Sequence, residues 1–377
     1  MDLDLTEEQE MLRSTARDFL AKECPKSLVR ELEDDEKGYS PDLWRKMAEL
    51  GWMGLVLPEE YDGMEMGFMD LIILIQEMGR NIVPGPFFSS VLLGSLPILF
   101  AGTNEQKKEF LPKVACGETI MTMALAEPNA RYDAAGVTVK ASAQGDGFVI
   151  NGTKLFIENA HIADYLVCVT RTKEGSSGED GITLFLVDAK SPGIKCEVMP
   201  TIADDKLCEV VFENVTVPKQ NMLGEIDNGW HIVAKTSQHA TIAKCAEMVG
   251  GAEAALDMTI AYVKERVQYG KPIGSFQAIQ HYCANMWTSV NASRNLMYKT
   301  AWKLAEELPA TEDVAITKGW INESYKFVTE RAVQCHGAIG LTRDHDLGLY
   351  YRRAKAAELF LGDTDFQREV VAQQIGL

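Results

Sequence analysis

A block of strand-like sequence between two long helical blocks is the feature that most restricts how this chain can fold. The first block is helical in pattern, and Thr6 and Gln9 have the spacing of a capping box that opens a helix. From about residue 119 the pattern changes to short runs rich in β-branched and aromatic residues, over 137–141, 148–150, 165–170, 182–187 and 210–217. Long helical patterns return after Pro218, over 230–265, 276–307, 312–336 and 346–374. We therefore predict an α+β fold.

The changes of pattern also place domain boundaries. We predict an N-terminal helical domain over 1–118, a middle β-barrel-like domain over 119–222 and a C-terminal four-helix bundle over 223–377. Short links between long helices are typical of such a bundle. Ala246, Gly250 and Ala254 leave little bulk along the helix 230–265, so we expect another helix to approach it closely. Ser40-Pro41 places a cap before a first-turn proline and predicts a further helix start.

Charge and cysteine usage exclude several classes of function. Asp and Glu number 55 against 37 Lys and Arg, a net charge of −18, so we expect neither nucleic acid nor a membrane surface as a partner. The start Met1-Asp2-Leu3-Asp4 lacks the basic and apolar regions of a signal peptide. The eight cysteines form no CxxC and no closely spaced pair, so we expect no metal site, reduced thiols and a cytoplasmic location. The absence of GxGxxG and P-loop motifs excludes a Rossmann-type nucleotide turn.

Five short motifs resemble those of the acyl-CoA dehydrogenase family, in the family's order and at compatible spacing. They are Ala126-Glu127-Pro128 followed by Asp133, the run 152–160 (GTKLFIENA), the run 265–274 (ERVQYGKPIG) followed by Phe276-Gln277, the run 334–340 (QCHGAIG) and the run 352–355 (RRAK). One such motif alone is a weak signal. Together they extend the resemblance over essentially the whole chain.

The resemblance implies a flavoenzyme that acts on a CoA thioester. Members of the family bind FAD and remove the α-proton and the β-hydride of an acyl-CoA, so it implies an FAD-dependent oxidoreductase acting on a CH–CH group. A carboxylate takes the proton, hydrogen bonds stabilise the charge on the thioester oxygen, and the flavin accepts the hydride. It also implies a homo- or hetero-tetramer with electron-transferring flavoprotein as the electron acceptor. Each FAD is then expected to lie across a dimer interface, with its nucleotide part held by the neighbouring chain.

The residues that the resemblance implies for a neighbour's FAD are all present. They are Arg266, Gln268, Tyr269, Gln277, Gln334 and Gly337. The planar guanidinium of Arg266 is suited to a pyrophosphate because it forms paired, charge-assisted hydrogen bonds. Gly337 allows the backbone to approach a nucleotide closely. The alternative interpretation of Arg266 is a surface salt bridge with Glu265.

The positions that the resemblance assigns to the chain's own flavin and base are altered. Ala126 and Glu158 stand where the family has threonines that face the flavin ring, and Phe156 is a further expected flavin contact. A carboxylate at Glu158 opposes the negative charge that develops on a reduced flavin. The usual position of the catalytic glutamate is occupied by Leu361, and a second base position known in the family by Ala240. Neither side chain can accept a proton.

Three hypotheses follow from these substitutions. The first is that the chain is the subunit without its own catalytic carboxylate in a hetero-oligomeric acyl-CoA dehydrogenase, where it completes the FAD site of a sister chain. The second is a homotetrameric acyl-CoA dehydrogenase with a displaced base, for which Asp363 is the first candidate, although a capping role explains that carboxylate equally. The third is a redox-silent scaffold of the same fold. The sequence does not identify the acyl group.

Overall fold

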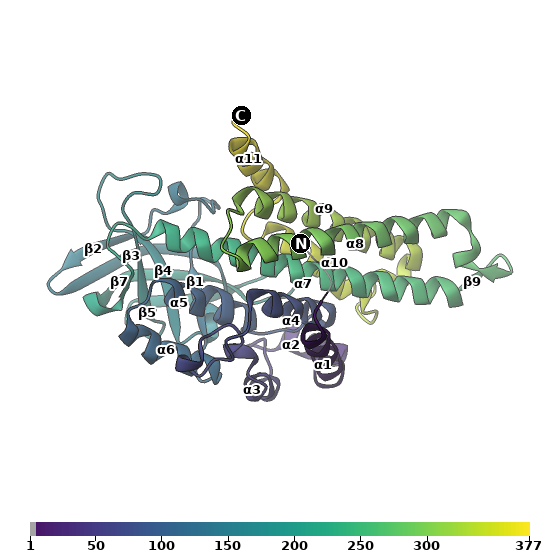
Figure 1. The fold of residues 1–377 in the computed structure, drawn as a ribbon, viewed down its shortest axis with the longest axis horizontal. Helices are drawn as coiled ribbons and strands as arrows, with labels where there is room; N and C mark the ends of the chain where they lie inside the picture. Colours follow the sequence, from purple (N-terminus) through teal and green to yellow (C-terminus); the bar gives the residue numbers. More distant parts are fainter. Residues whose placement is uncertain (1–4) are drawn as a thin grey trace. The chain divides into compact units, whose positions relative to one another are not determined.

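The computed structural model describes residues 5–377, so residues 1–4, on which the expectation about a signal peptide rests, lie outside it. The chain divides into two units (Figure 1). Of the described residues, the bundle unit comprises 5–30, Gly67–Val83 and Thr241–Leu377, and the sheet unit comprises Glu31–Met66 and Pro84–Ala240. No described helix is both long and apolar enough to cross a membrane.

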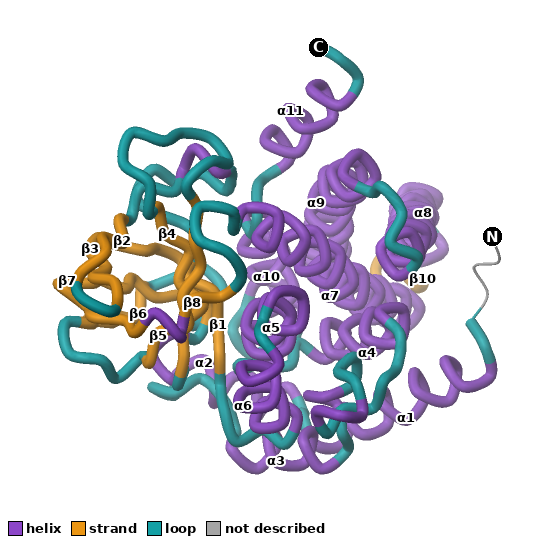
Figure 2. Tube along the Cα trace, turned by 60° about the vertical axis from the view of Figure 1, so that its left-hand side comes forward, coloured by secondary structure: helices purple, strands orange, loops and turns teal. Residues whose placement is uncertain are grey.

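The sheet unit is built on one mixed sheet (Figure 2). Its strands follow the order β6-β7-β3-β2-β4-β5-β8, and β1 pairs in parallel with β4. The strands are β1 (Met121–Ala124), β2 (Lys140–Gln144), β3 (Gly147–Glu158), β4 (Tyr165–Arg171), β5 (Ile182–Asp188), β6 (Ile194–Met199), β7 (Leu207–Pro218) and β8 (Met222–Leu223). The strands predicted at 148–150, 165–170, 182–187 and 210–217 are confirmed as parts of β3, β4, β5 and β7.

Three strands of this sheet and one boundary differ from the sequence prediction. The strand β8 has only two residues and is too short to give a strand pattern. β1 and β6 were not predicted because β1 is a short run of Met, Thr and Ala, and β6 is largely exposed and carries Lys and Glu. The run 137–141 was predicted as a strand, but β2 begins only at Lys140, because residues 134–136 form a short 3-10 turn, η4 (Ala134–Gly136), capped by Asp133. The Asp133 side chain accepts a hydrogen bond from the Gly136 N–H, which fixes this turn.

The sheet unit also contains helices. They are α3 (Pro41–Glu49), the π-helical segment η3 (Ser89–Ser95), α5 (Leu96–Ala101) and α6 (Asn104–Ala115). Ser40 caps α3 as predicted, since its Oγ accepts the Leu43 N–H at 3.2 Å. The segment η3 lies against β1. Gly94 makes this approach possible, because a Cβ there would lie 2.4 Å from that of Met121.

Long helices form the bundle unit. They are α1 (Glu7–Glu23), α4 (Phe68–Asn81), α8 (Gln277–Ala305), α9 (Thr311–His336), α10 (Leu347–Leu359) and α11 (Thr364–Gln374), while α2 (Lys26–Asp34) and α7 (Trp230–Glu265) each run from one unit into the other. The Thr6 capping box of α1 is confirmed, with Thr6 Oγ1 accepting the Gln9 N–H at 3.2 Å. The predicted close approach to 230–265 is also confirmed, because a Cβ on Gly250 would lie 1.9 Å from the carbonyl oxygen of Gln76 on α4.

The helix predicted over 346–374 is wrong as a single element. It is interrupted between α10 and α11, where Leu361 and Gly362 have φ angles of 52° and 105°. Backbone in this left-handed region cannot continue a right-handed helix. Asp363 then starts α11 as its N-cap. Apolar spacing continues across the break, and for this reason the sequence pattern predicted one helix instead of two.

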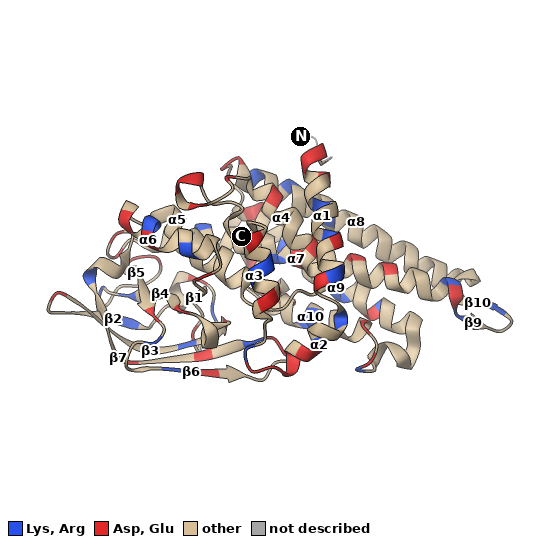
Figure 3. Ribbon diagram, turned by 90° about the horizontal axis from the view of Figure 1, so that it is seen from below, with Lys and Arg blue, Asp and Glu red and all other residues tan. Residues whose placement is uncertain are grey.

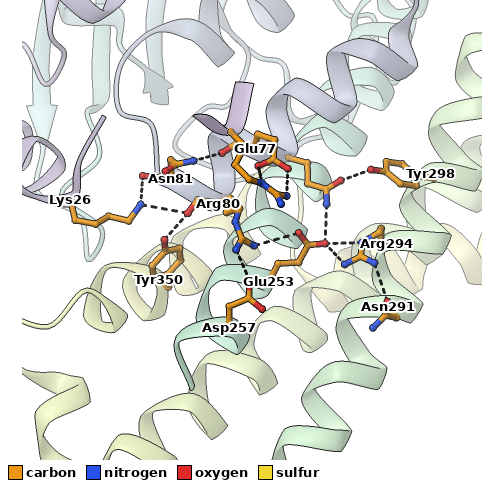
Figure 4. Close-up of polar contacts among 12 residues, drawn as sticks. Lys26, Glu77, Arg80, Asn81, Glu253, Asp257, Asn291, Arg294, Tyr298 and Tyr350 are labelled. Carbon is orange, nitrogen blue, oxygen red and sulfur yellow. Dashed lines mark hydrogen bonds and ion pairs between the residues drawn. The ribbon is translucent and has the colours of Figure 1, made fainter. Parts of the chain in front are cut away.

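Buried charges of the bundle unit gather where α4 meets α7 and α8 (Figure 4). Glu253 on α7 accepts hydrogen bonds from Gln76 Nε2 at 2.9 Å and from Arg294 Nε at 2.7 Å. Glu77 on α4 is held by Arg17 of α1, whose Nε lies 2.9 Å from its carboxylate. Because each buried carboxylate meets a guanidinium, these ion pairs join four helices without leaving an uncompensated charge.

Candidate functional site

Arg266 lies at the exposed end of α7, where the chain leaves the bundle. Its N–H donates to the Tyr262 carbonyl at 2.8 Å, and its own carbonyl accepts the Ile273 N–H at 2.8 Å. Within the described residues its guanidinium forms no ion pair and no side-chain hydrogen bond, so the alternative salt bridge with Glu265 is not formed. The backbone of Arg266 is therefore fixed while its donors face solvent.

The residues that follow Arg266 form a short projecting hairpin. Its strands are β9 (Val267–Gln268) and β10 (Lys271–Pro272), and it extends beyond the ends of α7 and α8 (Figure 1, Figure 3). Gln268 is exposed, and Tyr269 at the tip is 93% exposed with a φ of 52°. Gln277 is also exposed and begins α8. Four of the predicted cofactor residues thus lie together on a surface that little of this chain covers.

The run 334–340 begins at the carboxyl end of α9. Gln334 is exposed, and Gly337 ends the helix with φ 69° and ψ −150°. That backbone conformation is essentially restricted to glycine. Between them His336 is buried, and its ring stacks on Tyr262 of α7 at 4.3 Å between centroids. The Tyr262 carbonyl also accepts the hydrogen bond from the Arg266 N–H, so the stack links the Arg266 segment to the run 334–340.

His336 is a residue that the sequence interpretation missed. Burial lowers its pKa, and its Nδ1 lies 2.8 Å from the Ala332 carbonyl oxygen, which can only accept a hydrogen bond. The ring is therefore the neutral tautomer protonated on Nδ1, which suits stacking inside the bundle. The signal available in the sequence was its place inside QCHGAIG, between the two residues assigned to the cofactor.

Ala126, Phe156 and Glu158 lie in the sheet unit. Ala126 is buried, and its carbonyl accepts the Leu155 N–H at 2.9 Å, which sets it beside the strand that carries Phe156. The β3–β7 register shifts between Lys154 and Ile157. Phe156 in this irregular stretch has a φ of 58° and remains 39% exposed. Glu158 is half-buried and pairs in register with Leu207. The structure therefore brings these three positions to one part of the sheet.

A buried ion pair fixes this arrangement. Lys154 Nζ lies 2.8 Å from the Glu127 carboxylate, and the two side chains are 0% and 1% exposed. Lys154 also donates to the Leu125 carbonyl at 3.0 Å, while Glu127 accepts the N–H groups of Thr138 and Val139 at 2.9 and 3.0 Å. Burial acts to raise the pKa of Glu127, but the charge of Lys154 and these hydrogen bonds outweigh burial and lower that pKa. The pair thus joins the Ala126 segment to β3.

Leu361, at the position that the resemblance assigns to the catalytic base, has a side chain without acid–base function. It is 9% exposed, with a φ of 52°, in the turn between α10 and α11. Its carbonyl accepts a hydrogen bond from Gln367 Nε2 at 3.0 Å. Ala240, at the second position that the resemblance assigns to a base, is fully buried, and its methyl side chain is equally inert. Its neighbour His239 has Nδ1 2.8 Å from the Lys235 carbonyl oxygen, so this nitrogen donates rather than accepts.

Asp363 is an exposed helix cap. Its Oδ1 accepts the Phe366 N–H at 2.9 Å, which is the N-cap hydrogen bond of α11. The nearby carboxylate of Asp365 is 88% exposed and pairs with Arg368. Each of these groups therefore has an ordinary structural or surface role.

Lys318 is a second residue that the sequence interpretation missed. It lies on α9, is fully buried, and donates to the Asn322 side chain at 2.5 Å and to the carbonyls of Ala357 and Glu358 at 3.0 and 3.1 Å. Those carbonyls belong to the last turn of α10, where a cation is favourable. Lys318 thus supports the turn that holds Leu361. A lysine in the mostly apolar run 314–321, with Asn322 four residues later, was the available signal.

Sequence models of the three domains of acyl-CoA dehydrogenases match nearly the whole chain. The N-terminal, middle and C-terminal domain models match residues 6–118, 122–215 and 227–376. The chain belongs to the acyl-CoA dehydrogenase family. It is 35% identical to acryloyl-CoA reductase (NADH) of Anaerotignum propionicum, over 100% of this chain and 96% of that protein.

Solved structures of the family have the same fold. Butyryl-CoA dehydrogenase from Megasphaera elsdenii is 32% identical, with a TM-score of 0.92 and complete coverage of both chains. A chain of the ChsE4-ChsE5 complex from Mycobacterium tuberculosis is 25% identical, with a TM-score of 0.91 over 100% of this chain and 99% of that one. Members of the family are FAD-dependent oxidoreductases that act on CH–CH groups, and FAD is accordingly the cofactor of this enzyme.

The two units differ in how well their residues fit FAD. At the edge of the bundle unit lie the Arg266 guanidinium, which no described residue pairs with, exposed amides and a glycine-only backbone. These groups suit a diphosphate and a nucleoside. At the sheet positions that the resemblance assigns to the flavin, Ala126 has no side-chain donor, and a carboxylate at Glu158 opposes the negative charge of a reduced flavin. The bundle edge therefore fits FAD, and the sheet positions fit its isoalloxazine poorly.

Proposed function

We propose that this chain is the subunit without a catalytic carboxylate in a hetero-oligomeric acyl-CoA dehydrogenase, where it completes the FAD site of a sister chain. The observation that carries the proposal is a contrast within one molecule. Arg266 and the exposed residues around it keep their donors available for a ligand. Leu361 and Ala240 leave both known base positions without a proton acceptor. A division of labour between two different chains accounts for both facts.

In this assembly the bundle edge of the present chain binds the nucleotide part of the sister's FAD. Arg266 holds the pyrophosphate by paired hydrogen bonds, and Gln277 and Gln334 supply amide partners. Gln268, Tyr269 and Gly337 complete the surface around them. When bound, FAD supplies the hydride acceptor, and the sister chain supplies the carboxylate that takes the α-proton.

The Leu361 turn retains one group of use to a thioester. The Leu361 N–H makes no hydrogen bond to any described residue, while its carbonyl is held by Gln367. A fixed backbone N–H stabilises charge on a thioester oxygen without any side-chain base. Binding of an acyl-CoA by this chain therefore does not depend on a carboxylate at position 361.

The capping role of Asp363 weighs against a homotetramer with a displaced base. A general base needs a free lone pair directed at the substrate proton. The Asp363 carboxylate is exposed and accepts the Phe366 N–H of its own helix. The similarity to a chain of a complex with two differently named components, ChsE4 and ChsE5, also favours the hetero-oligomer. Acyl-CoA as substrate, electron-transferring flavoprotein as acceptor, a tetrameric assembly and a cytoplasmic location remain parts of the proposal.

The test compares FAD content with and without a homologous sister subunit that carries the glutamate. We expect the chain purified alone to be colourless, and the co-expressed complex to contain about half an FAD per chain. In the complex, Arg266→Ala should lower the FAD content, whereas Lys264→Ala, which removes a charge of the same sign from the same exposed helix end, should not. A yellow preparation of the lone chain with about one FAD per chain that acyl-CoA reduces would refute the proposal.

A further inference from the structure

Two thiols lie together on one face of the sheet unit, although 11 residues separate them along the chain. Cys196 is on the end strand β6 and Cys208 on its neighbour β7. The register pairs Cys196 with Val210 and Val198 with Cys208. Because alternate residues share a face, the two cysteines are diagonal neighbours on the same side of the sheet. Both are free thiols, with Cys196 exposed and Cys208 buried.

A histidine completes the cluster. His161 lies in the short 3-10 turn η5 (Ala160–Ile162), which packs on both β6 and β7. Its Nε2 is 3.1 Å from the Lys37 carbonyl oxygen, and its Nδ1 is 3.6 Å from Cys208 Sγ. A carbonyl only accepts hydrogen bonds, so Nε2 carries the proton of the neutral ring. The lone pair of Nδ1 therefore faces Cys208, as required of a group that takes a thiol proton.

The ionisation of Cys208 sets it apart from the other buried thiols of the described chain. A hydrogen bond with Cys196, assisted by His161, lowers the pKa of Cys208 to about 5, and the same hydrogen bond raises the pKa of Cys196. Burial alone raises the pKa of Cys168 and that of Cys245 to about 12. Thiolate character decides reactivity toward oxidants and electrophiles. Cys168 and Cys245 are therefore inert, whereas the pair at β6–β7 shares a labile proton.

We propose that Cys196 and Cys208 form a reactive dithiol site, with His161 as proton acceptor, that small-molecule disulfides oxidise to an intramolecular disulfide. Cys196, the accessible thiol, passes its proton to the Cys208 thiolate and attacks one sulfur of the small disulfide, and one small thiolate leaves. Cys208, giving its proton to His161, then attacks the Cys196 sulfur and displaces the second small thiolate. The dithiol starts with one proton, which passes from His161 to one of the small thiolates, and the other small thiolate leaves as the anion. The protein dithiol loses two electrons and the small disulfide gains them.

The position of the pair makes this disulfide reversible. Diagonal neighbours across an antiparallel ladder have Cα atoms about 7–8 Å apart, and a disulfide over more than about 7 Å requires movement of the backbone. Since β6 is the end strand of the sheet order, it can shift toward β7 without breaking a second ladder. A bond formed under such strain is more easily reduced than a relaxed structural disulfide. Cys208 is also the register partner of Ile157, the residue before Glu158.

The experiment treats the reduced, desalted full-length protein with glutathione disulfide and follows intact mass and free thiols. We expect the wild type to lose two thiols per chain and the mass of two hydrogens, and dithiothreitol to reverse the change. Cys208→Ser should stop at a stable glutathione adduct on Cys196. Cys196→Ser should react at least about tenfold more slowly at this site. Cys116→Ser removes another exposed thiol, one that donates to the Lys113 carbonyl, and should behave as the wild type.

A second probe separates a dithiol from two independent thiols and does not depend on oxidation. Phenylarsine oxide bridges paired thiols, so the wild type and Cys116→Ser should bind one arsenic per chain at β6–β7, and neither single variant of the pair should. Cys196→Ser alters an exposed side chain, which keeps the test valid if the Cys208 variant does not fold. A persistent glutathione adduct on the wild type, reaction confined to Cys116 or Cys283, or arsenic binding that survives Cys196→Ser would each overturn the proposal.

Discussion

Replacing Lys154 with methionine should destabilise the sheet unit far more than an ordinary ion-pair deletion. The substitution keeps most of the side-chain volume but removes the cation 2.8 Å from Glu127, whose carboxylate is 1% exposed. It also leaves the buried Leu125 carbonyl without its side-chain donor. Removal of one partner of a buried pair leaves an uncompensated charge and costs about 3–5 kcal/mol. At roughly 2–4 °C per kcal/mol, the expected fall in Tm is about 6–20 °C.

A matched control lies on the same sheet. Lys195 and Glu213 on β6 and β7 form an ion pair of 2.9 Å, but these side chains are 64% and 55% exposed. An exposed pair of this kind contributes at most about 1 kcal/mol. Because the two nitrogen–oxygen distances are nearly equal, the difference between Lys154→Met and Lys195→Met measures the effect of burial. Calorimetry of both variants beside the wild type supplies the comparison.

The pH dependence of the stability loss in Lys154→Met is an independent test of the same reasoning. In the wild type the pKa of Glu127 is lowered, so its stabilisation is present above the unfolded value of about 4.5 and is lost as pH falls through the folded value. In Lys154→Met burial is no longer opposed by the cation, so the pKa of Glu127 should rise. The deficit should then shrink between pH 8 and about pH 5, and Glu127→Gln in the same chain should remove this pH dependence. Equal losses in the two lysine variants, or a deficit constant with pH, would refute the reasoning.

Three further predictions concern the bundle unit. Asp363→Ala should cost about 1 kcal/mol through loss of the α11 cap, and Asp363→Asn should restore it; loss of turnover of the assembled enzyme in the Asn variant would instead identify a base. Burial lowers the pKa of Lys318 from 10.5 to about 8, so between pH 8 and 10.5 the unfolded chain binds more protons than the folded chain. The stability of the wild type relative to Lys318→Met should therefore rise as the pH is raised over that range, as measured by denaturant titrations. Gly337→Ala should cost about 1–3 kcal/mol because of its φ of 69° and ψ of −150°. Gly319→Ala, with its nearest contact at 3.6 Å inside α9, should be neutral or stabilising by thermal unfolding.

Local chemistry made the order of elements predictable from the sequence. Thr6 and Ser40 cap their helices because a short side-chain oxygen next to a helical run satisfies the first N–H groups, whatever the rest of the fold. Gly250 predicted a close helix approach for an equally local reason, since it lacks a side chain. The family and FAD followed from motif spacing, and the comparisons confirm them.

Register and chain reversal were not predictable from the same sequence. Cys196 and Cys208 are brought together only by the pairing of β6 with β7, and β6 has too many exposed polar residues to be recognised as a strand. The break between α10 and α11 at Leu361 was not predicted because the apolar spacing continues through it, although Gly362 was a local signal for a helix end. Lys318 acquires its role from carbonyls about 40 residues later in the chain, a relation that no local pattern contains.

The contrast between the exposed Arg266 and the strained turn at Leu361 supports the proposed division of labour. Arg266 is exposed and forms no ion pair within the described chain, so folding gives no reason for its identity, and only a ligand or neighbour can select it. The Leu361 turn is the reverse case, since its left-handed backbone is held by Lys318 and Gln367 while the side chain at its centre carries no chemistry. Maintaining such a turn costs strain. A scaffold with no ligand would gain nothing from that strain or from an unpaired arginine, whereas a subunit that positions a thioester and a neighbour's FAD needs both.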